Sequence, residues 1–457
     1  MKTVDVGVVL DEGPWSGYQK LLIFGTALTI ILDGIDNQLL GNAIPSLMRD
    51  WSLPRGAFTY VLAAGPLGMM FGGMIGGMLG DRIGRRTALL SSVIAFAALT
   101  LAIAMVNNVP LLTLLRFLAG LGLGGAMPNA AALASEYVPR RRRAFAVTLT
   151  IVCIPLGGTV AALLSAQVLP MYGWRTLFVV GGIIPMVLAV ILFKVLPESP
   201  HYLASHPERW SELIAMLRKL GHNLPADTSF IEARTGKAVA KSKSSIRDLF
   251  APAFRLDTLG LFGAFFFCLL ANYVGILLIP VTLTGAGFQQ AFASNALAAW
   301  NFGGVGGAIL GALIIQRIGS RITMLSLSAI SVASALARAT VLPPDPLNTF
   351  QLIVMFVILG GSLNAVQTTM YALAANVYPT EIRGTGIGAG VAVGRIGNVL
   401  ASYVGMFALD MGGTSAFFLT FAITMVIVFF SLALVRRHIE RTETEMVGAK
   451  VGAPAGH

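Results

Sequence analysis

Two aspartates in the first long apolar stretch of the chain are the residues with the clearest chemical potential. Asp33 and Asp36 lie near the middle of residues 21–46, where a charged side chain costs about 2.5–3.5 kcal/mol on membrane-insertion scales. At a spacing of three they share one helix face and can point into a common cavity. Two close carboxylates in a low dielectric resist simultaneous ionisation, which suits proton uptake and release. The pair is predicted to carry protons; the alternative is a structural aspartate neutralised by an arginine.

Two arginines within apolar stretches are suited to bind carboxylates. Arg116 lies six residues into the stretch 110–134, or about 9 Å at about 1.5 Å per residue, and its long side chain can reach the acidic pair. If protonation of an aspartate releases Arg116, or if substrate recruits it, proton binding and substrate binding are coupled by electrostatics. The alternative is that Arg116 snorkels to the outer interface. Arg395, about nine residues into the stretch 386–410, is predicted to bind a substrate carboxylate, because a guanidinium pairs bidentately and stays ionised.

Polar and aromatic residues at similar depth in four apolar stretches are candidates to complete a substrate cavity. They are Asn37, Gln38, Asn272, Tyr273, Trp300, Asn301, Gln367 and Tyr371. A flat aromatic ligand favours stacking surfaces combined with a few hydrogen bonds. The alternative for each aromatic residue is a place in the core or facing lipid.

The composition decides which elements position these residues. The chain has 457 residues, of which 56% are hydrophobic and 12% charged, with a mean hydropathy of +0.78. These values exclude a soluble globular protein and predict a polytopic membrane protein. The net charge of +11 is carried in short loops, so it indicates topology rather than nucleic-acid binding. Cys153 and Cys268 fall in different apolar stretches, which gives neither a disulfide framework nor metal-ligand spacing.

The predicted fold is an all-α membrane protein with twelve spanning helices in two six-helix bundles. The spans are 21–46, 57–79, 88–107, 110–134, 145–169, 175–196, 257–284, 290–315, 322–342, 349–375, 386–410 and 413–435. They give an N-terminal bundle at 1–196, a cytoplasmic linker at 197–255 with an amphipathic helix near 207–220, a C-terminal bundle at 256–436 and a cytoplasmic tail at 437–457. Lys and Arg concentrate on one side, which places both termini in the cytoplasm.

An internal repeat supports a duplicated unit. GGMLGDRIGRR (residues 76–86) recurs as GALIIQRIGSR (residues 311–321), and YVPRRRRA (residues 137–144) recurs as VYPTEIRG (residues 377–384). The same helix-end chemistry in the same order implies two six-helix halves with a site between them. Charged residues at these helix ends are predicted to form a cytoplasmic latch between the bundles: Asp81, Arg82, Arg85, Arg86, Glu136, Arg317, Arg321, Glu381 and Arg383.

These motifs, together with RFLAGLGLGG (residues 116–125) and PESPHYL (residues 197–203), resemble those of the major facilitator superfamily. ILDGIDNQLLG (residues 31–41) and GRIG (residues 394–397) are similar to those of its aromatic acid/proton symporters. The resemblance implies proton-coupled uptake of an aromatic carboxylate across the inner membrane, no cofactor besides the proton, and a monomer. It also implies that Gly77 and Gly84 act in gating with Asp81, Arg82 and Arg85.

Other functions stay open at this stage. Proton-coupled efflux of drugs or metabolites, or sugar and organic-acid transport on the same fold, are the alternatives within transport. A non-transporting sensor is a further alternative, although the acidic pair argues against it. An enzyme is not expected, because no histidine lies in a predicted span and no nucleophile–base pair or metal cluster is evident. Benzoate, hydroxybenzoates, larger lignin-derived acids, diacids and nonaromatic acids all suit an arginine in an apolar cavity.

Overall fold

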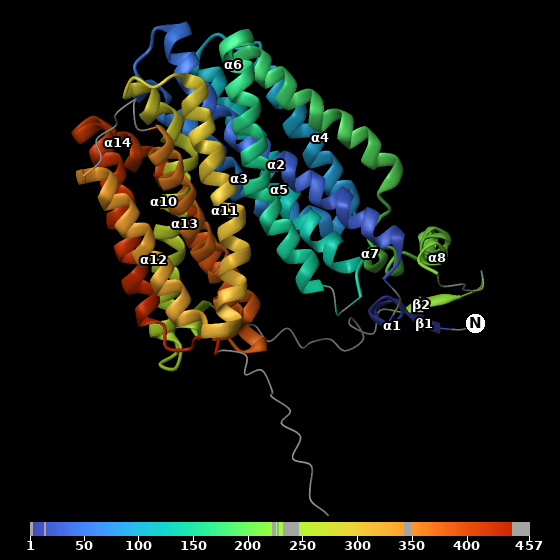
Figure 1. Ribbon diagram of the computed structural model, residues 1–457. Coiled ribbons are helices and arrows are strands. Elements are labelled where there is room, and N and C mark those ends of the chain that lie inside the picture. Colours follow the sequence, from blue (N-terminus) through green and yellow to red (C-terminus); the bar gives the residue numbers. More distant parts are fainter. Residues whose placement is uncertain are drawn as a thin grey trace, which may run out of the picture.

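A computed structural model describes residues 3–12, 15–139, 141, 143–221, 225, 228–231, 246–341 and 349–440. Nearly all of this part of the chain is helical (Figure 1). The N-terminal bundle consists of α2 (Gly17–Trp51), the 3-10 turn η1 (Arg55–Phe58), α3 (Thr59–Ile83), α4 (Arg85–Ile103), α5 (Val109–Glu136) and α6 (Arg143–Val195). The C-terminal bundle consists of α10 (Arg255–Gly285), α11 (Gln290–Ile318), α12 (Ser320–Leu336), the π-helical turn η5 (Ala337–Val341), α13 (Thr349–Val377) and α14 (Thr380–Leu434).

The described helices account for twelve spanning segments. Ten helices are long and apolar enough to cross a membrane. Two of them, α6 and α14, each join two helices across a break, at Gly173 and at Gly412 and Gly413 respectively. Gly173 and Gly413 have positive φ values of 76° and 59°, which residues with a side chain rarely adopt. Splitting both helices at these glycines gives the twelve spans and the all-α membrane fold predicted from the sequence.

The repeat is visible in the structure at the turns that follow α3 and α11. Gly84 ends α3 with a φ of 98°, and Gly319 ends α11 with a φ of 82°. The two glycines occupy corresponding positions of the repeated motif, and a second helix starts directly after each. A tight turn with positive φ requires glycine at this point, so the motif encodes the same connection in both bundles.

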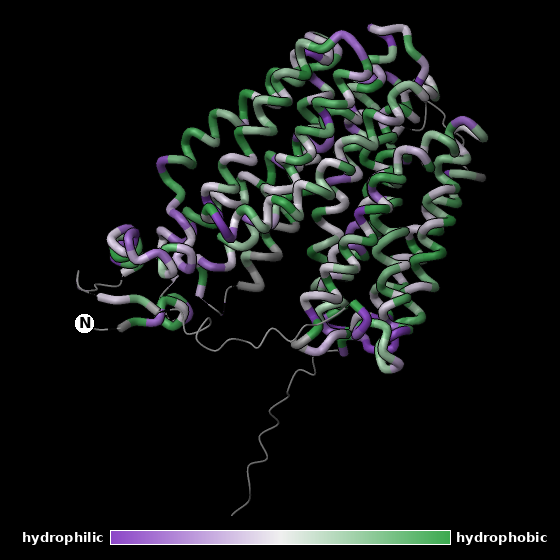
Figure 2. The backbone as a smooth tube through the Cα atoms, turned by 180° about the vertical axis from the view of Figure 1, so that it is seen from behind, coloured by the Kyte–Doolittle hydropathy of each residue, from purple (hydrophilic) through white to green (hydrophobic). Residues whose placement is uncertain are grey.

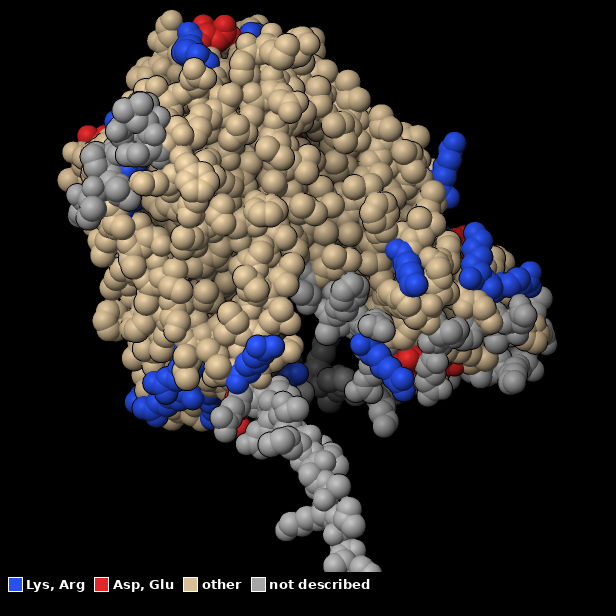
Figure 3. Space-filling model, viewed as in Figure 1, with Lys and Arg blue, Asp and Glu red and all other residues tan. Residues whose placement is uncertain are grey.

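The two bundles meet at one end and diverge at the other (Figure 1). Helix α2 contacts α10, α6 contacts α11, and α3 contacts α14 across the interface. Viewed from behind, hydrophobic residues cover the length of the helices and hydrophilic ones gather toward their ends (Figure 2). The space-filling view has an uncharged belt between charged ends, with a hollow between the bundles at the diverging end (Figure 3). The bundles are therefore open toward the end that carries the linker.

The segment between the bundles forms a small structure beside the N-terminal bundle. It contains α7 (Pro200–Ala204), the 3-10 turn η3 (Pro207–Arg209) and α8 (Trp210–Lys219). The 3-10 turn η4 (Ile246–Phe250), which precedes α10, packs instead against α10 and α14 of the C-terminal bundle. Turn η3 and helix α8 fall in the range 207–220, where the sequence predicts an amphipathic helix. Strand β1 (Thr3–Asp5), which precedes α1 (Val6–Glu12), pairs in parallel with β2 (Ser229–Ile231); this pairing was not predicted. Most of 222–245 and the tail 441–457 lie outside the described residues.

Candidate functional site

A buried ion pair lies inside the N-terminal bundle. Arg116 Nη1 on α5 is 3.2 Å from Asp36 Oδ2 on α2, and the two side chains are 3% and 0% exposed. Thr100 on α4 donates a hydrogen bond from its hydroxyl to the other carboxylate oxygen of Asp36. Arg116 is thus the partner of Asp36, as the sequence predicted. Removing either charge would leave the other buried and unpaired, which is strongly unfavourable.

Asp33, one helical turn before Asp36, differs from it in its partners. Its side chain is buried, and its Oδ1 atom has no hydrogen-bond partner within the described part of the chain. Gly34 follows it at a close contact with α6, where a Cβ would lie 2.3 Å from the carbonyl oxygen of Ile154. Since only glycine permits this approach, α6 packs directly on α2 beside the acidic pair. Asp33 is therefore a buried carboxylate without the ion pair that holds Asp36.

Arg395 forms a hydrogen bond to the backbone of the opposite bundle and contacts no carboxylate among the described residues. From α14 its Nη1 donates to the backbone oxygen of Met69 on α3 at 2.9 Å. Its side chain is partly exposed, and it does not line the cavity described below. The flanking Gly394 and Gly397 pack against α10, since a Cβ at Gly397 would lie 2.4 Å from the Phe266 oxygen. Binding of a substrate carboxylate by Arg395 stays a prediction.

Side-chain amides connect α2 to the C-terminal bundle. Gln38 and Asn301 exchange two hydrogen bonds, Nε2 to Oδ1 at 2.9 Å and Nδ2 to Oε1 at 2.8 Å. Asn37 donates to the Tyr273 hydroxyl at 3.2 Å. Gly158 on α6 makes room for the amide pair, because a Cβ there would lie 2.0 Å from Gln38 Nε2. These contacts bring together four residues that the sequence proposed for the cavity.

A cavity of about 200 Å³ lies between the bundles. Five of the predicted residues, Gln38, Asn272, Asn301, Gln367 and Tyr371, line it. The other lining residues are Met127, Ala131, Val152, Ile154 and Pro155 from the N-terminal bundle and Ile276, Ala308, Asn364 and Thr368 from the C-terminal bundle. Asn364 and Thr368 are the polar lining residues that the sequence analysis missed. Both lie in the long apolar run of α13, with no local signal other than their polarity.

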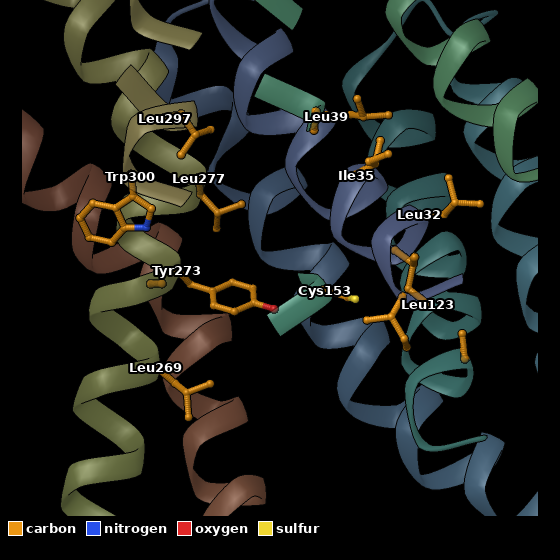
Figure 4. Close-up of a cluster of buried hydrophobic side chains, with 14 of the residues drawn as sticks. Leu32, Ile35, Leu39, Leu123, Cys153, Leu269, Tyr273, Leu277, Leu297 and Trp300 are labelled. Carbon is orange, nitrogen blue, oxygen red and sulfur yellow. The ribbon is translucent and has the colours of Figure 1, made fainter. Parts of the chain in front are cut away.

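Tyr273 and Trp300, both proposed for the cavity, point in different directions. The Tyr273 ring extends from α10 toward the N-terminal bundle, whereas the Trp300 ring turns away from it (Figure 4). Trp300 is fully buried and packs against Phe421 at 5.4 Å between ring centroids. Neither residue lines the cavity. In this conformation Trp300 belongs to the core of the C-terminal bundle.

The charged residues at the diverging end of the N-terminal bundle pair with one another. Arg85 contacts Asp81 at 3.4 Å and Glu136 at 3.1 Å. The Glu198 carboxylate accepts a bond from the backbone N–H of Arg86 at 2.8 Å, at the start of α4. These contacts join helices of one bundle, and the bundles diverge here. The predicted latch between bundles requires them to meet at this end, so it stays a prediction for the opposite conformation.

The remaining gating candidates lie largely at the surface of the described structure. Gly77 has open space where a Cβ would stand, and Arg82, Arg317 and Arg321 are exposed. Arg383 donates to the Tyr378 oxygen at 3.3 Å. The Glu381 side chain lies outside the described residues.

The end where the bundles meet carries contacts that the sequence analysis did not single out. Arg55 Nε donates to Asp410 Oδ1 at 2.8 Å, and Arg55 Nη2 donates to the Leu409 oxygen at 2.9 Å. Arg49 donates to Gln290, and Ser46 donates to the same amide oxygen at 2.9 Å. All of these link the N-terminal to the C-terminal bundle. The sequence pointed to these contacts only in that few arginines lie on the side opposite the linker, and Arg49 and Arg55 are two of them.

Comparison with known protein families shows the family to which this chain belongs. The model of the major facilitator superfamily matches residues 26–346 and 261–455. The chain belongs to the major facilitator superfamily. It is therefore a multi-pass membrane transporter, and its bundles are the two halves of this fold.

Relatives within this superfamily span almost the whole chain. The chain is 33% identical over 412 residues to a gallate transporter of Pseudomonas putida, covering 90% of both proteins. It is 32% identical over 419 residues to a 4-hydroxybenzoate transporter of the same organism, covering 90% of this chain and 91% of that protein. The fold is similar to a partially occluded inward-open structure of the E. coli xylose transporter, with a TM-score of 0.70, 17% identity and coverage of 92% and 97%.

Proposed function

We propose that this transporter takes up an aromatic carboxylate together with protons by alternating access. The observation that carries the substrate class is the likeness to the gallate and 4-hydroxybenzoate transporters along about nine-tenths of the chain. A cavity lined by both bundles, in a structure whose bundles diverge at one end, suits a substrate site at the interface of repeated halves. Rocking of the bundles would then expose this site to each side in turn.

Proton coupling is proposed for Asp36 and Asp33. A proton on Asp36 would remove the charge that pairs with Arg116. Protonation would therefore weaken the contact with Arg116, and the contact would in turn disfavour protonation. The ion pair of this structure corresponds to the deprotonated carboxylate. Asp33, buried beside it with an unbonded oxygen, is the second candidate carrier. The proton is the only coupling ion that the proposal needs, and no further cofactor enters it.

The substrate carboxylate is proposed to bind Arg395. Its hydrogen bond to the Met69 oxygen uses one of five N–H donors. It makes no ion pair with a carboxylate of the described chain. Since it bonds the opposite bundle, recruitment of Arg395 by substrate would change an interbundle contact. Binding and rocking are thereby linked through one side chain.

The proposed location is the inner membrane, with both termini in the cytoplasm and a monomer as the working unit. The side of the linker, counting its short loops, the linker itself and both termini, holds most of the Lys and Arg residues, which favours the cytoplasm for that side. The hollow of Figure 3 then opens inward.

Uptake of labelled 4-hydroxybenzoate into proteoliposomes tests the proposal. With an inward proton gradient the wild type is expected to accumulate the acid, and both Asp36→Asn and Arg395→Ala are expected to abolish accumulation. Equal flux with and without the gradient would contradict proton coupling. Absence of any flux of aromatic acids would contradict the substrate class.

A further inference from the structure

The two walls of the cavity differ in chemistry. The N-terminal bundle supplies an almost wholly apolar wall, of which Met127, Ile154 and Pro155 are part, with Gln38 as its polar residue. The C-terminal bundle supplies most of the polar groups, among them Asn272, Asn301, Asn364, Gln367, Thr368 and Tyr371. None of the described residues that line the cavity carries a formal charge. An aromatic ring can thus lie against the apolar wall while its edge faces neutral donors and acceptors.

Several polar groups of this wall are not saturated by the protein. Asn272 donates to the Gln367 oxygen at 2.6 Å, while its own Oδ1 atom is buried without a partner among the described residues. In the part of the chain that the structure describes, Gln367 has that single bond, and the Tyr371 hydroxyl has none. The Tyr371 ring is held against Phe265 at 5.3 Å between centroids. Among the described residues Asn272 Oδ1 is a buried acceptor without a partner, which is costly, so a ligand that donates to it gains binding free energy. Gln367 and Tyr371 are half-buried at the cavity, where they can bond the same ligand.

We propose, on the basis of the function proposed above, that Asn272, Gln367 and Tyr371 recognise ring hydroxyl groups, and that the substrate is a hydroxylated one-ring aromatic acid. A phenolic hydroxyl both donates and accepts, which complements amide and tyrosine groups. An unsubstituted ring leaves those groups unpaired, and a site built for a hydroxyl rejects the analogue that lacks it. The cavity of about 200 Å³ is also smaller than the roughly 300–1,000 Å³ of pockets for drug-sized ligands, which favours a one-ring acid.

Competition for uptake of labelled 4-hydroxybenzoate into proteoliposomes tests this inference. The competitors are benzoate, 4-hydroxybenzoate and 3,4,5-trihydroxybenzoate, compared by the concentration that halves uptake. Benzoate is expected to compete about tenfold less well than either hydroxylated acid, because it lacks the hydroxyl that forms a hydrogen bond with the site. Gln367→Met and Tyr371→Phe keep the side-chain size and remove polar groups, so each is expected to reduce this preference severalfold.

Thr369→Val on the same helix is the matched control. Its hydroxyl bonds the Ala365 oxygen of its own helix at 2.8 Å, and it does not line the cavity; the preference is expected to stay at the wild-type value. Equal competition by benzoate in the wild type, or an unchanged preference in both Gln367→Met and Tyr371→Phe, would overturn the inference while transport of aromatic acids stands. If no aromatic acid is taken up at all, the proposed function fails with it.

Discussion

The two bundles of this duplicated protein place different chemistry around the same interface. The N-terminal bundle buries charges, with Asp36 and Arg116 in contact at 3.2 Å and Asp33 one turn away. The C-terminal bundle faces the cavity with neutral amides and a tyrosine, and its interface arginine, Arg395, bonds a backbone oxygen of the other bundle. Duplication gave both bundles the same turns at Gly84 and Gly319. The comparison suggests a division of roles, in which the N-terminal bundle binds the coupling proton and the C-terminal bundle recognises the polar groups of the substrate.

The largest expected effect comes from Asp36→Asn. The change leaves Arg116 buried without its charge partner, and breaking a buried pair on one side costs about 3–5 kcal/mol. Both a lower unfolding temperature in detergent and loss of proton-driven accumulation are expected. Thermal unfolding followed by size-exclusion chromatography measures the first effect, and uptake under a proton gradient measures the second.

The double variant Asp36→Asn/Arg116→Gln separates these two effects. It removes both charges, so stability is expected to recover by more than half, while gradient-driven accumulation stays lost. Recovery of accumulation along with stability would show that the pair is structural, and the assignment of coupling to the N-terminal bundle would be wrong.

A smaller effect is expected from Gly158→Ala, which acts where the bundles touch. A methyl group at this position would lie 2.0 Å from Gln38 Nε2 and 2.8 Å from Asn301 Oδ1, so the amide pair must separate. Loss of the two neutral hydrogen bonds, each contributing about 0.5–1.5 kcal/mol, predicts an uptake rate reduced by about tenfold. Gly306→Ala on α11 is the control, because nothing lies within 4 Å of its added Cβ. Equal uptake rates for the two variants would contradict a role of the Gln38–Asn301 hydrogen bonds in transport.

The smallest effect is expected from Asp410→Asn at the end where the bundles meet. Arg55 and Asp410 are 35% and 59% exposed, and an exposed pair contributes less than about 1 kcal/mol. Since the pair closes this end, its loss is expected to raise labelling of Met127→Cys in the cavity by an impermeant thiol reagent added outside, up to about fivefold.

Asp50→Asn provides the matched control for that labelling experiment. Its partner Arg175 lies 3.0 Å away with both side chains 45% exposed, but the pair stays within the N-terminal bundle. No change in labelling is expected for it. A similar increase in both variants would mean that general loosening, rather than opening between the bundles, explains the result.

The sequence predicted the spans and the repeat because both depend on local patterns. Apolar length identifies a membrane helix, and Gly84 and Gly319 mark the same turn in each half. The Asp36–Arg116 pair was also predictable, since two opposite charges in one apolar bundle have few other partners. Orientation around each helix was not predictable. Trp300 and Asn301 are neighbours on a helix that is largely apolar, so no amphipathic pattern indicates that one faces the cavity and the other the core.

The measurement that tests the division of roles most directly compares exchange with accumulation in two variants, Asp36→Asn and Gln367→Met. Proteoliposomes loaded with unlabelled 4-hydroxybenzoate measure exchange of the labelled acid, and an imposed proton gradient measures accumulation. Asp36→Asn is expected to keep exchange with the wild-type preference among ring hydroxylations and to lose accumulation. Gln367→Met is expected to keep the dependence on the gradient and to lose the preference. If each variant impairs both properties to the same extent, coupling and recognition are not divided between the bundles, and the account is contradicted.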